Sequence, residues 1–354
     1  MSLILGIESS CDETACAIVE DGCTVKSTII ASQIKVHAQF GGVVPELAAR
    51  EHLKALDFVT SKALDDANVT MDDIDGIAFT QGPGLIPALL VGLNYAKGLA
   101  RGHKKPLIGV NHFMAHIYGA FLDGKDQLLA NPENYPLLAL VVSGGHTSLV
   151  LVEADGSARQ LGSTLDDAAG EALDKGAKLL DLGYPGGPII QKVAENGDSS
   201  KFDFPRPLTG GSGKALSPEH KYNFSFSGIK TALLYHMKKN EGNNDPQFLA
   251  DTVASYQMAV VDTLVRKAIV AVKDTKAKTC VLAGGVACNA LLRKELTERM
   301  PKFCQLHIAK PIYCTDNAAM VAGLGYHSFK RNEFVDDTCD SFARLPKIVR
   351  APFI

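Results

Sequence analysis

Two stretches of the chain share one pattern, and that pattern decides the predicted fold. Residues 3–22 read LILGIESSCDETACAIVEDG, and residues 136–156 read PLLALVVSGGHTSLVLVEADG. Each contains an apolar run, a small polar turn, a second apolar run and then Asp-Gly, which predicts a hairpin of buried strands. One such hairpin in each half predicts two similarly folded lobes. The alternative is coincidence, because apolar–turn–apolar patterns are common in α/β proteins.

The segments around these hairpins alternate between helix and strand patterns. Helices are predicted over 45–64, 168–182 and 246–273, and from about 290. The stretch 74–106 reads as a strand, a Gly/Pro loop and a helix, and PLIGV (106–110) reads as another strand. This alternation predicts the α/β class. The polar segment 196–221, rich in Gly, Pro, Ser and Lys, is predicted to be a lid or a mobile insertion.

Composition limits the class of protein. The chain has 354 residues, 46% hydrophobic and 21% charged, which is typical of a globular protein with two domains. A net charge of −3 argues against a generic polyanion binder, so a role with nucleic acid would need local basic patches or a partner protein. The eight cysteines form no CxxC pair, which indicates reduced thiols. The N-terminus has no signal pattern and no apolar run spans a membrane, so we expect a soluble, cytoplasmic protein.

Two histidines stand four residues apart in the run GVNHFMAHIYGAF. Asn111 is a good N-cap for a helix here, and residues i and i+4 share one helical face, so His112 and His116 can bind one ion. Asp316, in CTDNAAM, is the best candidate for a third ligand. Two histidines and a carboxylate leave coordination positions open for a substrate. The alternative is a pair of core or surface histidines without a metal.

Three glycine-rich loops are candidates for binding a nucleotide. They are VVSGGHTSL (141–149), YPGGP (184–188) and LAGGVACN (282–289). Glycine lets backbone amides approach a phosphate, although a tight turn alone explains any single loop. The chain contains no GxxxxGK[ST] loop and no GxGxxG after a strand, which disfavours a P-loop ATPase and a dinucleotide-binding fold.

Three acids, Glu8, Asp12 and Glu13, lie at the turn of the first hairpin. Such residues stabilise turns and cap local structure. They are also candidates for acid/base chemistry or orientation at the mouth of a cleft. The pattern alone leaves both interpretations open.

Ten motifs together carry a resemblance to a known family. In chain order they are GIESSCDETA, GGVVPELAAREH, TQGPGL, NHFMAH, VSGGHT, DDAAGEALDK, YPGGP, FSFSGIKTAL, GGVACN and TDNAAM. On these motifs, over about residues 3–330, the chain resembles bacterial members of the tRNA threonylcarbamoyladenosine transferase family (TsaD/Gcp), formerly labelled O-sialoglycoprotein endopeptidase. The resemblance implies the α/β, two-lobed actin-like ATPase (ASKHA) fold, with duplicated lobes and a cleft between them.

The resemblance also implies an activity. It is the transfer of threonylcarbamoyl from threonylcarbamoyl-AMP to the exocyclic amine of the adenosine adjacent to the anticodon, in tRNAs that read codons beginning with A. We expect an N-terminal lobe over 1–135, a C-terminal lobe over 136–315, and a helix and tail over 316–354 that return to the N-terminal lobe. The expected partners are tRNA, a paralogous scaffold subunit (TsaB-like) and a small ATPase subunit (TsaE-like), with no membrane.

Family positions carry over to this chain one by one. His112, His116 and Asp316 match the metal ligands, with Fe(2+) expected and Zn or Mg as alternatives. The positions that match the adenine-nucleotide contacts are Val142, Ser143, Gly144, Gly145, His146, Asp174, Gly187 and Asn289. Asp12 and Glu13 match acids near the active cleft and are the catalytic candidates, while the general base stays open. The loop over 210–222 departs from the family pattern.

Three other classes of function compete with this interpretation. A metallopeptidase is disfavoured because Phe113 occupies the position of the glutamate in the HExxH zinc-protease motif, and that glutamate is the general base. An ATPase or kinase of the same fold would depend on soluble magnesium rather than on a resident metal. A non-catalytic scaffold paralogue would have lost the histidines that this chain keeps.

Overall fold

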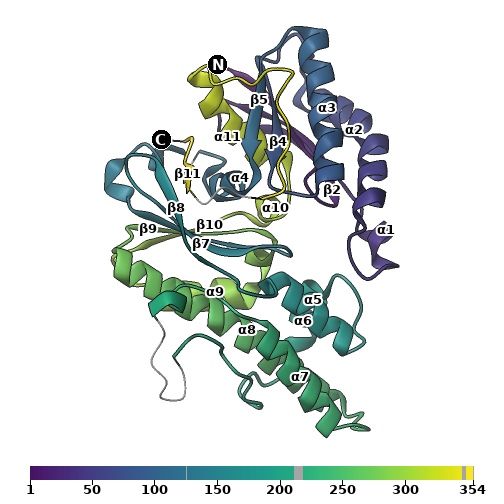
Figure 1. Cartoon of the computed structure of the whole chain (residues 1–354), viewed down its shortest axis with the longest axis vertical. Helices are drawn as coiled ribbons and strands as arrows, with labels where there is room; N and C mark the ends of the chain where they lie inside the picture. The colour runs from purple at the N-terminus through teal and green to yellow at the C-terminus, as the bar shows by residue number, and fades with distance from the viewer. Residues whose placement is uncertain (125, 211–217, 345–347, 354) are drawn as a thin grey trace. The chain divides into compact units, whose positions relative to one another are not determined.

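The computed structural model describes residues 1–124, 126–210, 218–344 and 348–353. The chain divides into two compact units, and its strands form two β-sheets (Figure 1). Unit 1 comprises Met1–Asn134, Glu153–Ala158 and Ala309–Ile354, and unit 2 comprises Tyr135–Val152 and Arg159–Ile308. Unit 1 is therefore assembled from segments near both ends of the chain.

The sheet of unit 1 has the strand order β3-β2-β1-β4-β5. Its strands are β1 (Leu3–Glu8), β2 (Glu13–Glu20), β3 (Thr24–Ser32), β4 (Gly76–Gly82) and β5 (Leu107–Asn111). β1 pairs antiparallel with β2 and parallel with β4, which confirms the first predicted hairpin. All six residues of β1 are buried, as expected for a central strand that is covered on both faces.

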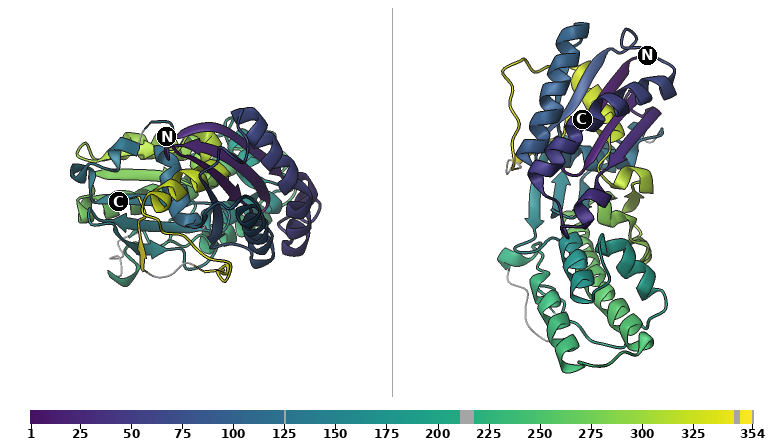
Figure 2. Two further views of the ribbon diagram at one scale, coloured as in Figure 1. Left: turned by 90° about the horizontal axis from the view of Figure 1, so that it is seen from above. Right: turned by 90° about the vertical axis from the view of Figure 1, so that its right-hand side faces the viewer.

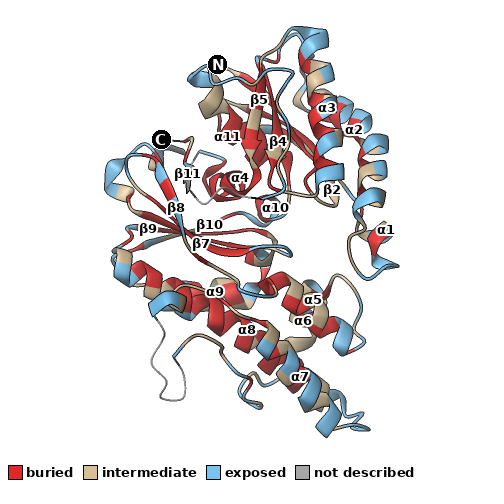
Figure 3. Cartoon of the chain, in the orientation of Figure 1, coloured by how far each residue is buried: buried red, intermediate tan, exposed pale blue. Residues whose placement is uncertain are grey.

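Helices cover both faces of this sheet. α2 (Pro45–Ala67) and α3 (Ile86–His103) pack side by side, as Figure 2 shows, and their core includes Leu5 and Ile7 of β1. α11 (Ala318–Lys330) covers the other face and is buried over its first eight residues (Figure 3). Gly6 of β1 faces α11, and a Cβ there would clash with the carbonyl of Ala318, so the close approach requires glycine.

Further short helices of unit 1 connect these elements. They are α1 (Ile34–Ala38), α4 (His112–Tyr118) and α10 (Pro311–Cys314), with single 3-10 turns η1 (Gly119–Phe121), η2 (Asp126–Leu128) and η3 (Pro132–Asn134).

The second sheet has the strand order β10-β9-β6-β7-β8-β11. Its strands are β6 (Leu137–Val142), β7 (Thr147–Val152), β8 (Ser157–Ser163), β9 (Thr279–Ala283), β10 (Gln305–Ile308) and β11 (Ile348–Arg350). β6 pairs antiparallel with β7 and parallel with β9, so the second predicted hairpin is also confirmed. Read from β8 to β10, the order repeats that from β3 to β5, and the duplicated pattern of the sequence corresponds to a duplicated topology.

Unit 2 contains the longest helix of the described chain. Its helices are α5 (Ala169–Leu179), α6 (Gly186–Ala194), α7 (Ser227–Lys239), α8 (Pro246–Thr275) and α9 (Ala290–Arg299), with the turns η4 (Pro218–His220) and η5 (Gly285–Cys288). α8 begins after Asp245, whose side chain accepts a hydrogen bond from the Gln247 amide at 3.0 Å. The helices predicted over 45–64, 168–182 and 246–273, and from about 290, are confirmed to within three residues at each stated end. No described helix combines the length and apolar character needed to cross a membrane.

Some expectations need correction. The YPGGP stretch was expected to be a loop, but Gly186 and Gly187 form the first turn of α6.

Residues 211–217 of the predicted lid segment 196–221 lie outside the described residues, and the lid role stays a prediction. The described flanks are held by α8, because Ser255 accepts from the Phe202 amide at 3.1 Å and Lys267 Nζ donates to the carbonyls of His220 and Lys221 at 2.9 Å.

Candidate functional site

The paired histidines lie on α4, as predicted. Asn111 caps this helix, since its side chain accepts a hydrogen bond from the Met114 amide at 3.0 Å. His112 and His116 are both buried, and their rings are 4.6 Å apart in an edge-to-face arrangement. The i, i+4 spacing therefore presents both imidazoles on one side of a buried helix.

Asp316 meets these histidines from the far end of the sequence. It lies between α10 and α11, directly before the N-cap residue Asn317. Its Oδ1 atom is 3.1 Å from Nε2 of His116 and 3.5 Å from Nε2 of His112. One ligand atom from each residue lies within 4.8 Å of the other two, so the three side chains can hold a metal ion. The structure brings together the residues that the sequence pattern proposed as ligands.

Glu8 forms a second layer around this group. Its Oε2 atom is 3.0 Å from Nδ1 of His112 and accepts a hydrogen bond from Thr80 Oγ at 2.6 Å. Its Oε1 atom accepts from the Ser10 amide, and the residue is fully buried. A carboxylate on the outer ring nitrogen of a metal-binding histidine fixes the tautomer and orientation of the ring. Sequence analysis placed Glu8 at the hairpin turn and missed this role.

The charges of the site fit a bound cation. Burial lowers the pKa of His112, but the carboxylates of Glu8 and Asp316 outweigh burial and raise this pKa to about 10. The pKa of Asp316 is lowered, because the two histidines outweigh its burial. Positive charge is therefore favoured where the two Nε2 atoms and the carboxylate converge. His116 Nδ1 is buried without a hydrogen-bond partner among the described residues. The set of two histidines and one carboxylate is typical of ferrous sites with open coordination positions.

Asp12 and Glu13 lie where the first hairpin turns into β2. Glu13 Oε1 accepts a hydrogen bond from Ser32 Oγ at 2.9 Å, whereas its buried Oε2 has no partner in the described part of the chain. Burial raises the pKa of Glu13 to about 8 and also raises the pKa of Asp12. The negative charge of Asp316 contributes to both shifts, so both acids lie within electrostatic reach of the metal-binding group.

We expect Glu13→Gln to change how stability depends on pH. The pKa of Glu13 is about 8 in the folded chain against an ordinary value of 4.5. The folded state therefore holds a proton that the unfolded chain has lost, and the wild type loses stability as pH rises from about 4.5 to about 8. Glutamine removes this loss, which is worth roughly 1–3 kcal/mol at pH 8 after allowance for partial solvent screening. Thermal unfolding at pH 5, 6.5 and 8 measures it, and parallel curves for the two proteins would contradict it.

In unit 2 the candidate nucleotide loop is a tight turn between β6 and β7. The Ser143 amide donates to the His146 carbonyl at 2.7 Å, and the His146 amide donates to Ser143 Oγ at 3.1 Å. Gly144 and Gly145 are exposed, and a Cβ at either position would meet nothing within 4 Å. The turn is thus closed at its base and open at its tip.

Neighbouring segments of unit 2 support this turn. The Gly170 amide, in the first turn of α5, donates to the Ser143 carbonyl at 3.2 Å. Gly284, after β9, has φ of +90°, and a Cβ there would clash with the Val142 carbonyl. The loop after β9 therefore packs against the base of the turn, and this approach needs glycine.

The other predicted nucleotide positions of unit 2 are also held in place. Asp174 accepts a hydrogen bond from the Gly186 amide at 2.7 Å, which ties α5 to the start of α6. Gly187 follows in the same turn, and a Cβ there would meet nothing within 4 Å. Asn289 is buried, caps α9 and donates to Gln257 Oε1 at 3.1 Å.

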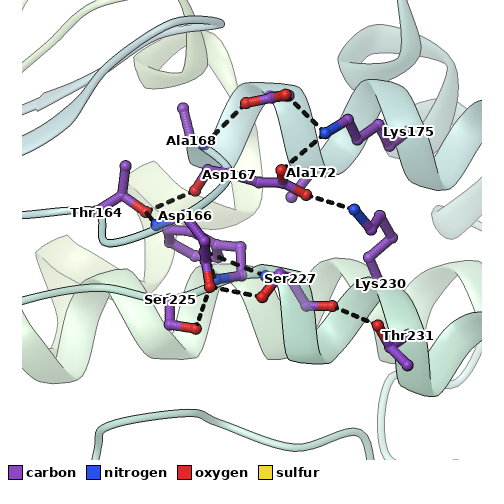
Figure 4. Close-up of polar contacts among 12 residues, drawn as sticks. Thr164, Asp166, Asp167, Ala168, Ala172, Lys175, Ser225, Ser227, Lys230 and Thr231 are labelled. Atoms are coloured by element: carbon purple, nitrogen blue, oxygen red, sulfur yellow. Dashed lines mark hydrogen bonds and ion pairs between the residues drawn. The ribbon is translucent and has the colours of Figure 1, made fainter.

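The motifs DDAAGEALDK and FSFSGIKTAL meet in a network of ion pairs and hydrogen bonds that the sequence did not predict (Figure 4). Asp166 accepts hydrogen bonds from Ser225 Oγ and Ser227 Oγ, both at 2.6 Å, at the start of α7. Asp167 pairs with Lys175 at 2.7 Å and with Lys230 at 2.8 Å. These contacts fix the segment that leads into α5, and α5 in turn supports the glycine turn.

Comparison with known proteins gives a family match over most of the chain. The family model described as tRNA N6-adenosine threonylcarbamoyltransferase (TsaD) matches residues 24–323. The protein of that name from Thermosipho africanus is 47% identical over 97% of this chain and 99% of its own length. Another, from Geotalea uraniireducens, is 50% identical over 93% of this chain and 92% of its own length.

Solved structures of low sequence identity share the fold. Component A of (R)-2-hydroxyglutaryl-CoA dehydratase from Acidaminococcus fermentans aligns with a TM-score of 0.52 at 16% identity, over 92% of this chain and 98% of that one. Full-length HypF, in a phosphate- and nucleotide-bound form, aligns with a TM-score of 0.58 at 13% identity, over 96% of this chain and 56% of that one. At these identities the likeness concerns the fold alone, and it agrees with the predicted actin-like α/β fold.

Proposed function

The chain belongs to the tRNA N6-adenosine threonylcarbamoyltransferase family, and from that premise we propose which residues perform each part of the reaction. The chain attaches a threonylcarbamoyl group to N6 of an adenosine in tRNA. The proposed donor is threonylcarbamoyl-AMP, and the proposed acceptor is the adenosine adjacent to the anticodon in tRNAs that read codons beginning with A. The observation that carries the proposal is the buried group of His112, His116 and Asp316.

We propose that unit 1 holds one divalent ion, Fe(2+), through His112, His116 and Asp316. Ferrous iron suits two imidazoles and one carboxylate, whereas Mg prefers oxygen ligands, and Zn is the closer alternative. When bound, the ion supplies positive charge that can bind and polarise an oxygen of the donor. Glu8 keeps the His112 ring oriented with Nε2 directed toward Asp316.

We propose that unit 2 binds the adenylate part of the donor. The open tip of the turn at Gly144 and Gly145 lets the backbone approach a ligand. Gly187 lies in the first turn of α6, where the helix dipole favours a phosphate. Asp174 and Asn289 are held by neighbouring groups and offer polar atoms on α5 and at the start of α9.

The proposed chemical step is an acyl transfer. The N6 amine attacks the carbamoyl carbon, a C–N bond forms, the bond from that carbon to the phosphate oxygen breaks, and AMP leaves. The amine must also lose one proton, and we propose that the carboxylate of either Asp12 or Glu13, in its ionised form, receives it. Burial raises the pKa of both carboxyl groups, so a larger share of each is protonated at neutral pH, while the ionised share is a stronger base than in water. Holding both reactants in position can supply about 7–11 kcal/mol of the barrier reduction.

We propose that other proteins assist this chain. Its net charge of −3 offers little general attraction for tRNA. The proposed partners are a paralogous scaffold subunit (TsaB-like) and a small ATPase subunit (TsaE-like). Exposed apolar side chains support contact with a protein, since Leu53 and Phe58 of α2 are 69% and 65% exposed. Because tRNA is the acceptor, we propose that the protein acts in the cytoplasm.

The test combines the purified chain with tRNA and threonylcarbamoyl-AMP, with and without these partners, and detects the modified nucleoside by mass spectrometry. We expect slow transfer by the chain alone and much faster transfer with both partners, because the chain alone attracts tRNA weakly. A sialoglycoprotein should remain intact in the same assay. Cleavage of that glycoprotein, lost in His116→Ala and without any tRNA modification, would overturn the proposal and favour a metallopeptidase.

A further inference from the structure

A hydrogen-bonded series of buried polar side chains lies next to the Asp12–Glu13 loop, and the proposed reaction does not use this series. Gln33 is 4% exposed, and Thr14, His37 and His52 are fully buried. His37 belongs to α1 and His52 to α2, outside the metal-binding group. Buried polar groups are costly unless their partners are satisfied, so a connected set of this kind has a specific arrangement to maintain.

In this series of side chains, the hydrogen bonds point the same way, from His37 through Gln33 to His52. The Val44 amide donates to His37 Nδ1 at 3.3 Å, so His37 Nε2 carries the proton and donates to Gln33 Oε1 at 3.0 Å. Gln33 Nε2 then faces His52 Nδ1 at 3.4 Å. Both rings are therefore neutral, each with its proton on Nε2.

The last donor of the series, His52, holds the loop that carries Asp12 and Glu13. His52 Nε2 donates to the Cys11 carbonyl at 3.0 Å, and a carbonyl can only accept, which fixes the direction of this bond. The next carbonyl, that of Asp12, accepts from the Gln33 amide, also at 3.0 Å. Two consecutive peptide groups of the loop are thus held by the segment that includes α1 and α2. Thr14 Oγ contacts His52 Nδ1 at 2.7 Å and fixes the ring from its other side.

We propose that His52 is a positioning residue of the transferase. Its Nε2–H group holds the Cys11 carbonyl and thereby sets where the carboxyl groups of Asp12 and Glu13 lie relative to Asp316. The inference rests on the proposed roles of Asp12 and Glu13. It assigns a function to the His52 end of the motif GGVVPELAAREH, which no step of the reaction otherwise explains.

Two amide substitutions separate the two ring nitrogens of His52. The Gln side-chain NH2 reaches the position of Nε2, so His52→Gln can still donate to the Cys11 carbonyl. The Asn NH2 reaches only the position of Nδ1, so His52→Asn loses that bond. Displacing a reacting group by about 1 Å can cost about 10²-fold. We expect His52→Asn to lower kcat by about 10- to 100-fold, with the KM for threonylcarbamoyl-AMP and the metal content unchanged, and His52→Gln to recover most of kcat.

A control variant distinguishes positioning from general destabilisation. Val59 is fully buried on the same helix and packs in its core, so Val59→Ala should lower the Tm while leaving kcat near that of the wild type. If His52→Asn does not fold, Gln33→Leu replaces it, because that change removes the amide that faces the His52 ring. We then expect kcat to fall in the same direction.

Two outcomes overturn the proposal. The first is that folded His52→Asn or Gln33→Leu keeps a kcat as high as that of Val59→Ala, when the two variants have lost the same amount of Tm. The other is a kcat for His52→Gln as low as that of His52→Asn. Asp12→Asn and Glu13→Gln are measured alongside. Full activity in both of these would instead remove the proposed roles of the acids, which keeps the two failures distinguishable.

Discussion

Replacing His112 with alanine should remove the bound metal and lower transfer by at least about 10³-fold, while the chain stays folded. The variant deletes the ring that contacts both Glu8 and Asp316 and leaves two carboxylates without a cation between them. A metal contributes several kcal/mol of charge stabilisation in such reactions, and each 1.4 kcal/mol is tenfold in rate. Elemental analysis and the nucleoside assay measure the two effects.

Two further variants make the test of the metal site specific. His103→Ala changes an exposed histidine at the end of α3 and should leave metal content and activity unchanged. Glu8→Gln keeps a hydrogen-bonding side chain beside His112, and we expect about a 10- to 100-fold loss of metal affinity. Full activity of a metal-free His112→Ala protein would refute the role of this group in the reaction.

Gly145→Val should weaken binding of the adenylate by at least about 10²-fold with little change in Tm. Glycine at the tip of a turn lets the backbone approach a ligand, and valine fills that space. A Cβ at Gly145 would meet no atom of the chain within 4 Å, so the side chain should disturb the ligand and not the fold. Isothermal calorimetry with a non-reactive adenylate measures the affinity.

The glycines of the chain provide controls for this second experiment. Gly102→Val introduces the same side chain at an exposed position of α3 with nothing within 4 Å, and nucleotide affinity should not change. Gly284→Val should instead lower stability, because that residue has φ of +90° and faces the Val142 carbonyl. Unchanged affinity in folded Gly145→Val would rule out this turn as the nucleotide site.

The central parts of the fold could be predicted because burial leaves a continuous pattern in the sequence. β1 and β6 are buried at every residue, so each reads as an unbroken apolar run. β3, at the edge of the first sheet, and its counterpart β8, between β7 and β11, were not predicted, since most of their residues are exposed or half-buried and the apolar signal is absent. The first turn of α6 was mistaken for a loop because Gly-Gly is a weak helix signal, and its neighbours in α5 support it.

The candidate site likewise contains residues that could be predicted from the sequence and residues that could not. His112 and His116 could be paired from the sequence because one helix sets their spacing, Asp316 could be named as the candidate third ligand from its own motif, and the family resemblance implies the same three residues. The role of Glu8 could not be predicted, because it depends on Thr80 of β4, a strand that follows more than sixty residues later. The contact of His52 with the Cys11 carbonyl likewise requires α2 to pack beside the hairpin turn. Contacts of this kind arise from tertiary packing and leave no local pattern.

Because the chain returns to unit 1 near its C-terminal end, the parts of the metal-binding group are synthesised at different times. Asp316 is 200 residues from His116, and α11, which covers one face of the first sheet, follows directly after it. At about 5–20 residues per second, a ribosome needs about 10–40 s to cover that distance. During this interval both histidines have been made, yet the ligand set is incomplete and an apolar sheet face lacks its helix. Metal loading must therefore follow synthesis, and a nascent chain interrupted before Asp316 presents a surface that chaperones and proteases recognise.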